Sequence, residues 1–294
     1  MNAHHIDTDS NLGLDANEKE VHRVWDENAG IWQYVTPPWR PSVGVLDLYK
    51  TLSQEKLGGN VLILGATPEL RDLASQYNKA VTVVDMSQKM LEQTSKFLKN
   101  ADPEKERWIV GDWCNIALPI TSFDLILGDM IWWLLPFSKQ NALSAIMANL
   151  LKDDGHFISR FRIFLPQRTR EDPRKIVTDY LQLIEDDSSY KAELSQAMLL
   201  HVSDIVSNVA QRRMDRNRVA SLLMQIANDV SLHHKTLLEK AAHSWEGKLN
   251  LTQNTQEEII ECLGDKFNLL QKEFAIDYPE GELYPIMKWV KRQV

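Results

Sequence analysis

Four residues suited to ligand binding stand at or just beyond the end of a short apolar segment. They are Gly65 after Val61–Leu64, Asp85 after Ala80–Val84, Asp112 after Trp108–Val110 and Asp129 after Leu125–Leu127. Asp85 follows Gly65 by 20 residues, the spacing at which a carboxylate at the end of a second strand accepts hydrogen bonds from ribose hydroxyls. The pattern therefore indicates a site for a nucleotide-like cofactor.

The turn at Gly65–Leu70 discriminates between cofactors that the spacing alone allows, namely NAD, FAD and S-adenosylmethionine. It lacks the second and third glycines of the G-x-G-x-x-G turn, which brings backbone N–H groups close to a pyrophosphate. Pro68 removes one N–H donor, and Glu69 would repel a phosphate. Because S-adenosylmethionine has no phosphate, the turn favours it over a dinucleotide.

The segments around these positions have the patterns of alternating strands and helices. A hydroxyl cap and an early proline at Thr67–Glu69 predict a helix start, and further helices are expected after Ser87 and from Ser138. The turn Asp153–Gly155 is expected to lead into a fifth strand at His156–Phe164. Such alternation predicts right-handed crossovers and a parallel sheet covered by helices on both faces. Ligands bind beyond the carboxyl ends of such strands, so the four positions above are predicted to face one crevice.

The rest of the chain divides into segments with helical and with strand patterns of apolar residues. Residues 166–260 carry apolar stripes at helical spacing without a convincing strand, and strand patterns return at Phe267–Ile276 and Tyr284–Val290. We predict an N-terminal helical cap at 1–55, a cofactor-binding core at 56–165, a helical insertion at 166–260 that forms a substrate lid, and final strands at 261–294 that complete the sheet.

The motifs of the core resemble those of class I S-adenosylmethionine-dependent methyltransferases of the small-molecule type. The resembling segments are Val61–Gly65, Val83–Asp85, Gly111–Trp113 and Phe123–Asp129. The resemblance covers about residues 56–165, extends to the last 30 and is absent from the insertion. The family's first motif usually has an acidic residue where this chain has Ile63. It usually has its second and third glycines where this chain has Thr67 and Glu69. The resemblance implies a Rossmann-like, mostly parallel, seven-stranded sheet whose final strands are antiparallel.

The resemblance also implies a role for each position that faces S-adenosylmethionine. Gly65, Ala66 and Thr67 would lie along the methionine moiety, Asp85 and Met86 would contact the ribose and the adenine, Asp112 and Trp113 would contact the adenine, and Asp129 would border the transferable methyl group. Each has a plain structural alternative, because an Asp at a strand end also caps a turn or a helix, and a Trp also packs a lid.

The N-terminal segment is unusually aromatic, with Trp25, Trp32, Tyr34 and Trp39 close to Arg40. In many small-molecule methyltransferases of this class a similar leader folds over the cofactor. The resemblance therefore implies that Tyr34 contacts the cofactor and that Arg40 meets its carboxylate. The alternative is that these rings only dock a helix on the core.

The composition is that of a globular protein. The 294 residues carry 33 basic and 41 acidic side chains, a net charge of −8, and 44% of them are apolar. The acidic balance disfavours a nucleic acid partner. No apolar stretch approaches the roughly 18 residues that a membrane span needs, and no signal peptide is recognised.

The cysteines and histidines predict neither disulfides nor a metal site. Cys114 and Cys262 are too few for a disulfide framework, which favours a reducing, cytoplasmic location. His201 and Asp204 form a helical i, i+3 pair, but one such pair is weak grounds for a metal site, so none is expected.

These observations predict an S-adenosylmethionine-dependent methyltransferase (EC 2.1.1.-) that transfers a methyl group to a small-molecule acceptor by in-line displacement. A general base is needed only if the acceptor must lose a proton, and the candidates are Asp129, His156 and a His of the insertion. Two alternatives stay open: methylation of RNA or protein, and a non-catalytic binding or partner-activating module with the same fold. The acceptor atom and the oligomeric state, including a homodimer, stay undecided.

Overall fold

One mixed sheet forms the centre of the protein. The computed structural model describes residues 7–8, 23–27, 29–78, 80–187, 189, 191–207, 212–246 and 251–293. The strands are β1 (Asp7–Thr8), β2 (Asn60–Leu64), β3 (Ala80–Asp85), β4 (Arg107–Val110), β5 (Phe123–Asp129), β6 (Leu151–Arg160), β7 (Phe267–Glu273) and β8 (Ile286–Lys291), in the spatial order β1-β4-β3-β2-β5-β6-β8-β7. The pairs among β1–β6 are parallel, and β8 is antiparallel to both β6 and β7. The predicted mostly parallel sheet of seven strands is confirmed, and the two-residue β1 extends it beside β4.

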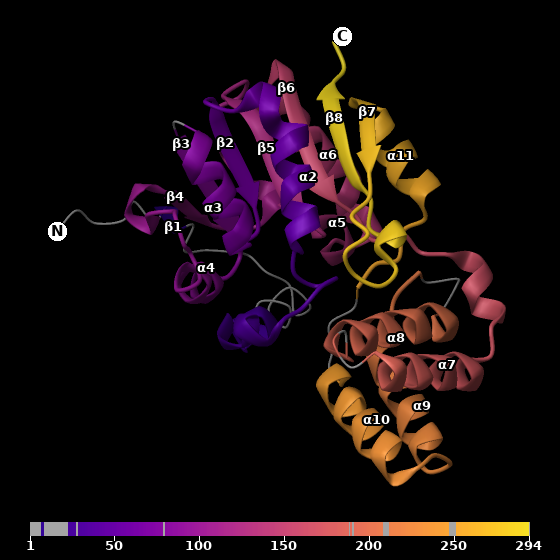
Figure 1. Ribbon diagram of the computed structural model, residues 1–294. Helices are drawn as coiled ribbons and strands as arrows, with labels where there is room; N and C mark the ends of the chain where they lie inside the picture. Colours follow the sequence, from indigo (N-terminus) through magenta and orange to yellow (C-terminus); the bar gives the residue numbers. More distant parts are fainter. Residues whose placement is uncertain are drawn as a thin grey trace.

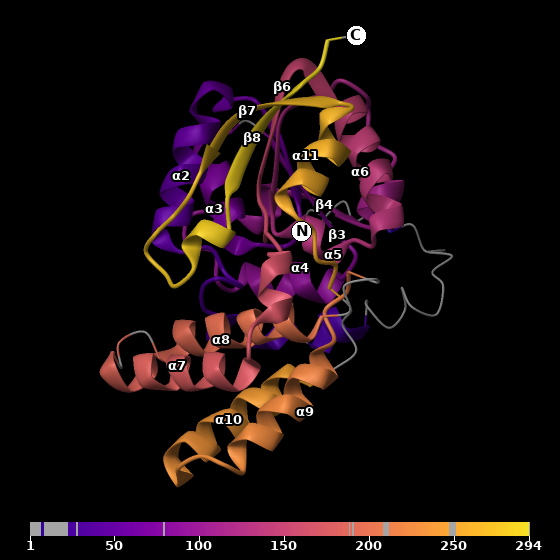
Figure 2. The ribbon, with the colours of Figure 1, turned by 90° about the vertical axis from the view of Figure 1, so that its right-hand side faces the viewer.

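Helices cover both faces of this sheet (Figure 2). One face carries α2 (Val43–Ser53), α3 (Pro68–Tyr77) and α4 (Gln88–Ser95), and the other carries α6 (Phe137–Leu150) and α11 (Gln256–Gly264). Alternate residues of β2 therefore enter different cores: Val61 and Ile63 pack into one buried cluster, and Leu62 and Leu64 into the other. Burial on both faces explains why this strand is an unbroken apolar run.

Local signals explain where the helices of the core begin. Pro68 is the first residue of α3, as predicted, although the hydroxyl of Thr67 accepts no hydrogen bond from the helix. The hydroxyl of Ser87 caps α4 by accepting a hydrogen bond from the N–H three residues on. α6 begins at Phe137, one residue before the predicted start at Ser138.

The strands near the carboxyl half depart from their predicted bounds. β6 begins at Leu151, so Asp153–Gly155, predicted as a turn before the strand, lies within it. The register to β5 passes from the pair Phe123 and Leu151 to the pair Leu125 and His156, so β6 bulges here. β7 and β8 are both shorter than predicted at the connection between them.

Four helices form a separate layer beyond the carboxyl ends of the parallel strands (Figure 1). They are α7 (Pro173–Asp186), α8 (Lys191–Val206), α9 (Arg216–Ala227) and α10 (Leu232–Trp245). α7 lies along α8, and α9 lies along α10. The predicted end of the insertion, residue 260, falls inside α11. Ile259 and Leu263 of α11 pack against the sheet with Phe267, so this helix covers the sheet instead of the cavity.

The predicted N-terminal cap is described in part. Its described residues include a helical turn at 23–27, a 3-10 helix at Ala29–Tyr34, and α2. Residues 1–6, 9–22 and 28 lie outside the described residues. Val45, Tyr49 and Leu52 of α2 are buried against the core, which places this helix on the sheet.

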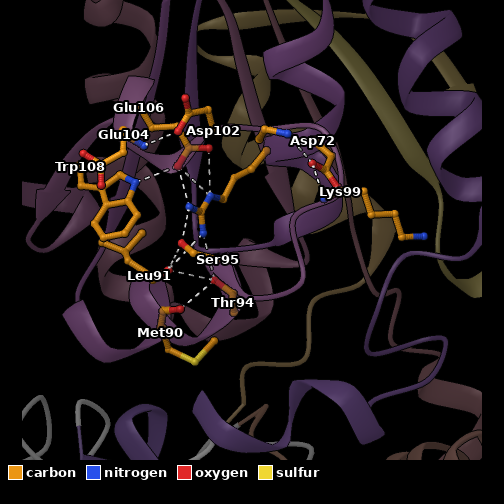
Figure 3. A network of polar contacts seen from close by, with 12 residues as sticks. Asp72, Met90, Leu91, Thr94, Ser95, Lys99, Asp102, Glu104, Glu106 and Trp108 are labelled. Atoms are coloured by element: carbon orange, nitrogen blue, oxygen red, sulfur yellow. Dashed lines mark hydrogen bonds and ion pairs between the residues drawn. The ribbon is translucent and has the colours of Figure 1, made fainter. Parts of the chain in front are cut away.

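A buried ion pair joins α3, α4 and β4 (Figure 3). Nη2 of Arg71 lies 2.6 Å from Oε2 of Glu106, and both side chains are almost fully buried. Other N–H groups of the guanidinium donate to the carbonyl of Leu91 and to the hydroxyls of Thr94 and Ser95, all on α4. The network satisfies the guanidinium donors and holds together the elements that lead to the second and third of the four predicted site positions.

Removal of the carboxylate of Glu106 is expected to destabilise the protein strongly. Glu106→Ala leaves the Arg71 guanidinium buried without its counter-charge, which costs about 3–5 kcal/mol of unfolding free energy. Urea unfolding followed by circular dichroism measures this loss. Glu261→Ala, on the exposed side of α11, is the control and should stay within about 0.5 kcal/mol of wild type. A loss of about 1 kcal/mol or less for Glu106→Ala, the size typical of exposed pairs, would contradict the proposed role.

Candidate active site

One cavity of about 370 Å³ lies beyond the carboxyl ends of the parallel strands. Gly65, Asp85, Asp112 and Asp129 all line it, so the four positions predicted to face one crevice do so. The predicted residues Ala66, Thr67, Met86 and Trp113 line it as well. The fold thus brings eight of the predicted site residues together, while the roles given to them stay predictions.

The turn after β2 is held by Asp85 at the end of β3. Gly65 has φ of +95°, which side-chain-bearing residues rarely adopt, and its N–H donates to the carbonyl of Val84 at 2.8 Å. The Asp85 carboxylate accepts the N–H of Ala66 at 3.0 Å and that of Ser87 at 2.8 Å. These bonds fix both carboxylate oxygens of Asp85 beside the turn at the end of β3.

Asp112 and Trp113 form the part of the wall that follows β4. Oδ2 of Asp112 lies 2.8 Å from Nζ of Lys139, and its other oxygen accepts the N–H two residues on. The indole N–H of Trp113 donates to the carbonyl of Val84 at 2.8 Å, which fixes the ring against β3. Lys139 also lines the cavity but was not predicted, because only the packing of α6 brings it to Asp112.

Asp129 is held by a bidentate ion pair. Nε and Nη2 of Arg160 lie 2.8 Å from its two oxygens, and both side chains are almost fully buried. Tyr49 of α2 donates to the carbonyl of Gly128 at 2.6 Å and accepts the N–H of Arg160 at 2.7 Å. Burial and the nearby Asp129 carboxylate raise the pKa of Tyr49 well above its ordinary value, so its hydroxyl keeps the proton. The guanidinium of Arg160 engages both oxygens of Asp129 and orients the carboxylate.

Tryptophans from three parts of the chain meet at the cavity. Trp25, Trp32 and Trp39 line it from the N-terminal part, and Trp133 lines it from α5 (Ile131–Leu134). The rings of Trp39 and Trp133 have centroids 4.7 Å apart, and Trp39 meets Trp245 of α10 edge-on at 5.5 Å. The leader, the core and the insertion are therefore joined by contacts among Trp39, Trp133 and Trp245, of which the first two line the cavity.

Two segments of the insertion complete the rim. Arg213 and Thr252 line the cavity and pair with each other as an isolated antiparallel bridge. The N–H of Thr252 donates to the carbonyl of Trp133 at 2.9 Å, which joins the insertion to α5. No sequence signal pointed to this pair, because its members are 39 residues apart and meet only in the folded chain.

Two residues predicted from the leader do not line the cavity. Tyr34 is 75% exposed. Nε of Arg40 donates to the carboxylate of Glu69 in the first turn of α3. Arg40 thus pairs with Glu69 in this structure, and its expected contact with a cofactor carboxylate stays a prediction.

His156 is likewise remote from the cavity. It pairs with Leu125 near the start of β5, four residues before Arg160, and it does not line the cavity. Burial, together with the charges of Lys288 and Lys56, lowers the pKa of its imidazole to about 4. This position removes His156 as a candidate base, because strand direction places it toward the opposite end of the sheet.

The segment that builds most of the cavity matches a known family. Residues 64–155 match the family model described as a methyltransferase domain. This segment is similar to a methyltransferase domain, and the match covers less than half of the chain. It contains all four of the strand-end positions, and the residues from the leader and the insertion that reach the cavity lie outside it. No curated protein sequence matches the chain.

Solved structures share the fold of the methyltransferase domain and its surroundings. A Rhodobacter sphaeroides protein, provisionally assigned as a zinc-dependent alcohol dehydrogenase, has a TM-score of 0.55 at 14% identity, covering 92% of this chain and 98% of that one. The N-methyltransferase NodS from Bradyrhizobium japonicum WM9, in complex with S-adenosyl-L-homocysteine, has a TM-score of 0.52 at 9% identity, covering 93% and 100%. An S-adenosylmethionine-dependent methyltransferase from Clostridium acetobutylicum has a TM-score of 0.51 at 14% identity, covering 92% and 100%. The predicted class I methyltransferase fold is thereby confirmed.

The described part of the chain holds no group of three or more His, Cys, Asp or Glu side chains placed to bind a metal ion. His201 and Asp204, the pair considered as metal ligands in the sequence, bind other side chains instead. Nε2 of His201 lies 2.7 Å from Glu171, and Oδ1 of Asp204 lies 2.6 Å from Arg162. Across the same described residues, no helix is both long and apolar enough to cross a membrane.

The buried His156 is expected to make the protein less stable as the pH falls below about 6.5. Its pKa is about 4 in the folded chain, so between these values the unfolded chain binds a proton that the folded chain does not. The stability contributed by the neutral imidazole is therefore complete above the ordinary pKa and is lost progressively as the pH falls toward 4. His156→Gln should reduce the loss of unfolding free energy between about pH 7 and about pH 5, measured by urea denaturation at both values.

The control for this variant is His243→Gln, on the exposed side of α10, which should leave the pH dependence as in wild type. If wild type and His156→Gln lose the same unfolding free energy between the two pH values, the imidazole is not held neutral by burial.

Proposed function

We propose that this chain is an S-adenosylmethionine-dependent methyltransferase that acts on a small-molecule acceptor. The observation that carries the proposal is the convergence of Gly65, Asp85, Asp112 and Asp129 on one cavity that also reaches the insertion. The NodS structure, which shares the fold, contains S-adenosyl-L-homocysteine. In our proposal the strand-end side of the cavity holds the cofactor, and the side lined by Trp39 and Trp133 holds the acceptor.

The residues of the strand-end side fit S-adenosylmethionine. Gly65 is required at the turn by its φ of +95°, and a Cβ there would lie 3.7 Å from the ring of Trp113, an ordinary contact distance. In our proposal the Asp85 carboxylate lies beside the ribose, and Met86 and Met90 supply polarisable apolar surface for an adenine.

The same turn does not fit a pyrophosphate. Pro68, the first residue of α3, has no N–H to donate, and Glu69 places a carboxylate in the first turn of the helix. A dinucleotide would therefore lose one N–H donor where its phosphates lie, and the Glu69 carboxylate in the same turn is already paired with Arg40. This observation favours S-adenosylmethionine over NAD or FAD.

The reaction requires mainly orientation and a dry pocket. When bound, S-adenosylmethionine supplies a methyl group on a sulfonium that leaves as a neutral thioether. Trp39 and Trp133 exclude water from the acceptor side, and Thr252 joins the insertion to this ring pair. Asp129, fixed by Arg160, gives a rigid polar border at which the nucleophile can be aligned.

The cavity supplies no unengaged general base. Among the described residues that line it, the only carboxylates are Asp85, Asp112 and Asp129, and each already accepts from backbone N–H groups or from a cation. His156, the other candidate, lies elsewhere. The acceptor is therefore proposed to bring a nucleophilic atom that carries an available lone pair at neutral pH.

The acceptor is proposed to be small because the cavity is covered by the insertion. Arg213 and Thr252 reach over the rim from segments flanking α9 and α10, and the contact of Trp39 with Trp245 joins α10 to the leader. The net charge of −8 also disfavours RNA as the substrate.

Titration calorimetry with S-adenosyl-L-homocysteine and with NAD tests the cofactor. We expect heat of binding from S-adenosyl-L-homocysteine and none from NAD, because the turn lacks the donors that a pyrophosphate needs. No heat from S-adenosyl-L-homocysteine at about millimolar concentration would favour the non-catalytic module and reject the proposal. If it binds, transfer of a labelled methyl group to small-molecule fractions then tests turnover.

Asp85→Asn is expected to weaken S-adenosyl-L-homocysteine binding by about tenfold or more, because it removes a charged acceptor of ribose hydroxyls. Calorimetry gives the affinity, and urea unfolding shows whether the loss of the bonds to Ala66 and Ser87 affects folding. Asp47→Asn, at an exposed position on α2, is the control. Unchanged affinity in a folded Asp85→Asn would place the ribose elsewhere.

A further inference from the structure

One cation of the cavity has no partner within the described residues. Lys139 is paired with Asp112, and Arg160 with Asp129. Arg213 also lines the cavity, its side chain is exposed, and among the described residues its guanidinium has no hydrogen bond, ion pair or ring contact. A guanidinium presents its donors in a planar fork that matches a carboxylate. The rim therefore has an anion-binding group that the protein itself does not use.

The backbone that carries Arg213 is firmly held. Backbone hydrogen bonds of 2.9 and 3.0 Å join residues 212–214 to residues 251–253 on either side of the bridge to Thr252. Thr252 is in turn bonded to the carbonyl of Trp133. The backbone position of Arg213 is thus tied, through Thr252, to Trp133 on the aromatic side of the cavity.

The lining on this side of the cavity is aromatic and apolar. The rings of Trp39 and Trp133 are tilted by 31° to each other, and Leu134 and Leu135 continue the lining. Rings of this size favour a planar apolar body, while a charged group in the same place would lose its hydration. An anionic ligand with a flat body would therefore direct its charge toward Arg213.

We infer that the acceptor is a flat, apolar carboxylic acid whose carboxylate is bound by Arg213 while its body packs on Trp39 and Trp133. This inference rests on the proposed function, because it assigns the strand-end side of the cavity to the cofactor. The carboxylate serves as an anchor at the rim, which orients the rest of the acceptor toward Asp129. The competing partner for Arg213 is the carboxylate of the cofactor itself, and the experiment separates the two.

The test compares a charged probe with its neutral isostere. The probes are 2-naphthoate and 2-naphthamide, titrated by calorimetry into wild type, Arg213→Gln, Arg213→Lys and Arg218→Gln, each with and without saturating S-adenosyl-L-homocysteine. Arg218, an exposed arginine of α9 that does not line the cavity, gives the matched control. S-adenosyl-L-homocysteine is also titrated alone into every variant, and urea unfolding verifies that each is folded.

We expect wild type and Arg218→Gln to bind 2-naphthoate about tenfold more tightly than 2-naphthamide, the effect of a charge-assisted hydrogen bond. Arg213→Gln should abolish this preference without changing the affinity for 2-naphthamide, and Arg213→Lys should retain part of it. The affinity for S-adenosyl-L-homocysteine should be the same in all four proteins.

Three results would overturn the inference. They are the absence of binding by either probe, equal binding of both probes to wild type, and a preference for 2-naphthoate that survives in Arg213→Gln. A tenfold loss of S-adenosyl-L-homocysteine affinity in Arg213→Gln would instead assign this arginine to the cofactor and also reject the inference. Failure of wild type to bind S-adenosyl-L-homocysteine would reject the proposed function. Because the two probes are also titrated without S-adenosyl-L-homocysteine, this failure can be told apart from failure of the inference about Arg213.

Discussion

The ion pair between Asp129 and Arg160 determines how the rim of the cavity is built. It joins the last residues of β5 and β6, and the same guanidinium donates to the carbonyl of Pro38 at 2.7 Å. Tyr49 of α2 adds hydrogen bonds to Gly128 and Arg160. Because both charges are almost fully buried, loss of either would leave the other uncompensated. The leader, α2 and the two central strands are therefore held in one arrangement around the cavity.

The carboxylates around the cavity share one electrostatic feature. Asp85 is stabilised by backbone N–H groups, Asp112 by a lysine of α6 and Asp129 by an arginine of β6. Carboxylates held in this way have a fixed orientation and polarise the pocket that they line. This suits a displacement in which the leaving group is already activated and alignment of the nucleophile limits the rate. Arg213 differs in having no partner among the described residues, which is why it bears on the acceptor.

The strand-end part of the site could be predicted from the sequence, whereas its other half could not. Gly65 and Asp85 follow apolar runs, and parallel strands bring their carboxyl ends to one edge, so order along the chain was enough. Arg40 and His156 do not line the cavity, for physical reasons that the sequence does not show. The first is neutralised by a glutamate of α3, and the second precedes the end of β6 by four residues. Thr252 gave no signal, since it reaches the cavity through contacts distant in sequence.

The sequence by itself determined the parallel sheet, its helical cover and the four residues at the strand ends, because burial on both faces and residue periodicity are local properties. Only the tertiary structure decided which charges compensate one another and which cation of the cavity has no partner among the described residues. Those outcomes depend on distances between segments such as Asp112 and Lys139, or Trp133 and Thr252. Electrostatic energies change steeply with such distances and with burial, and neither is encoded in spacing along the chain.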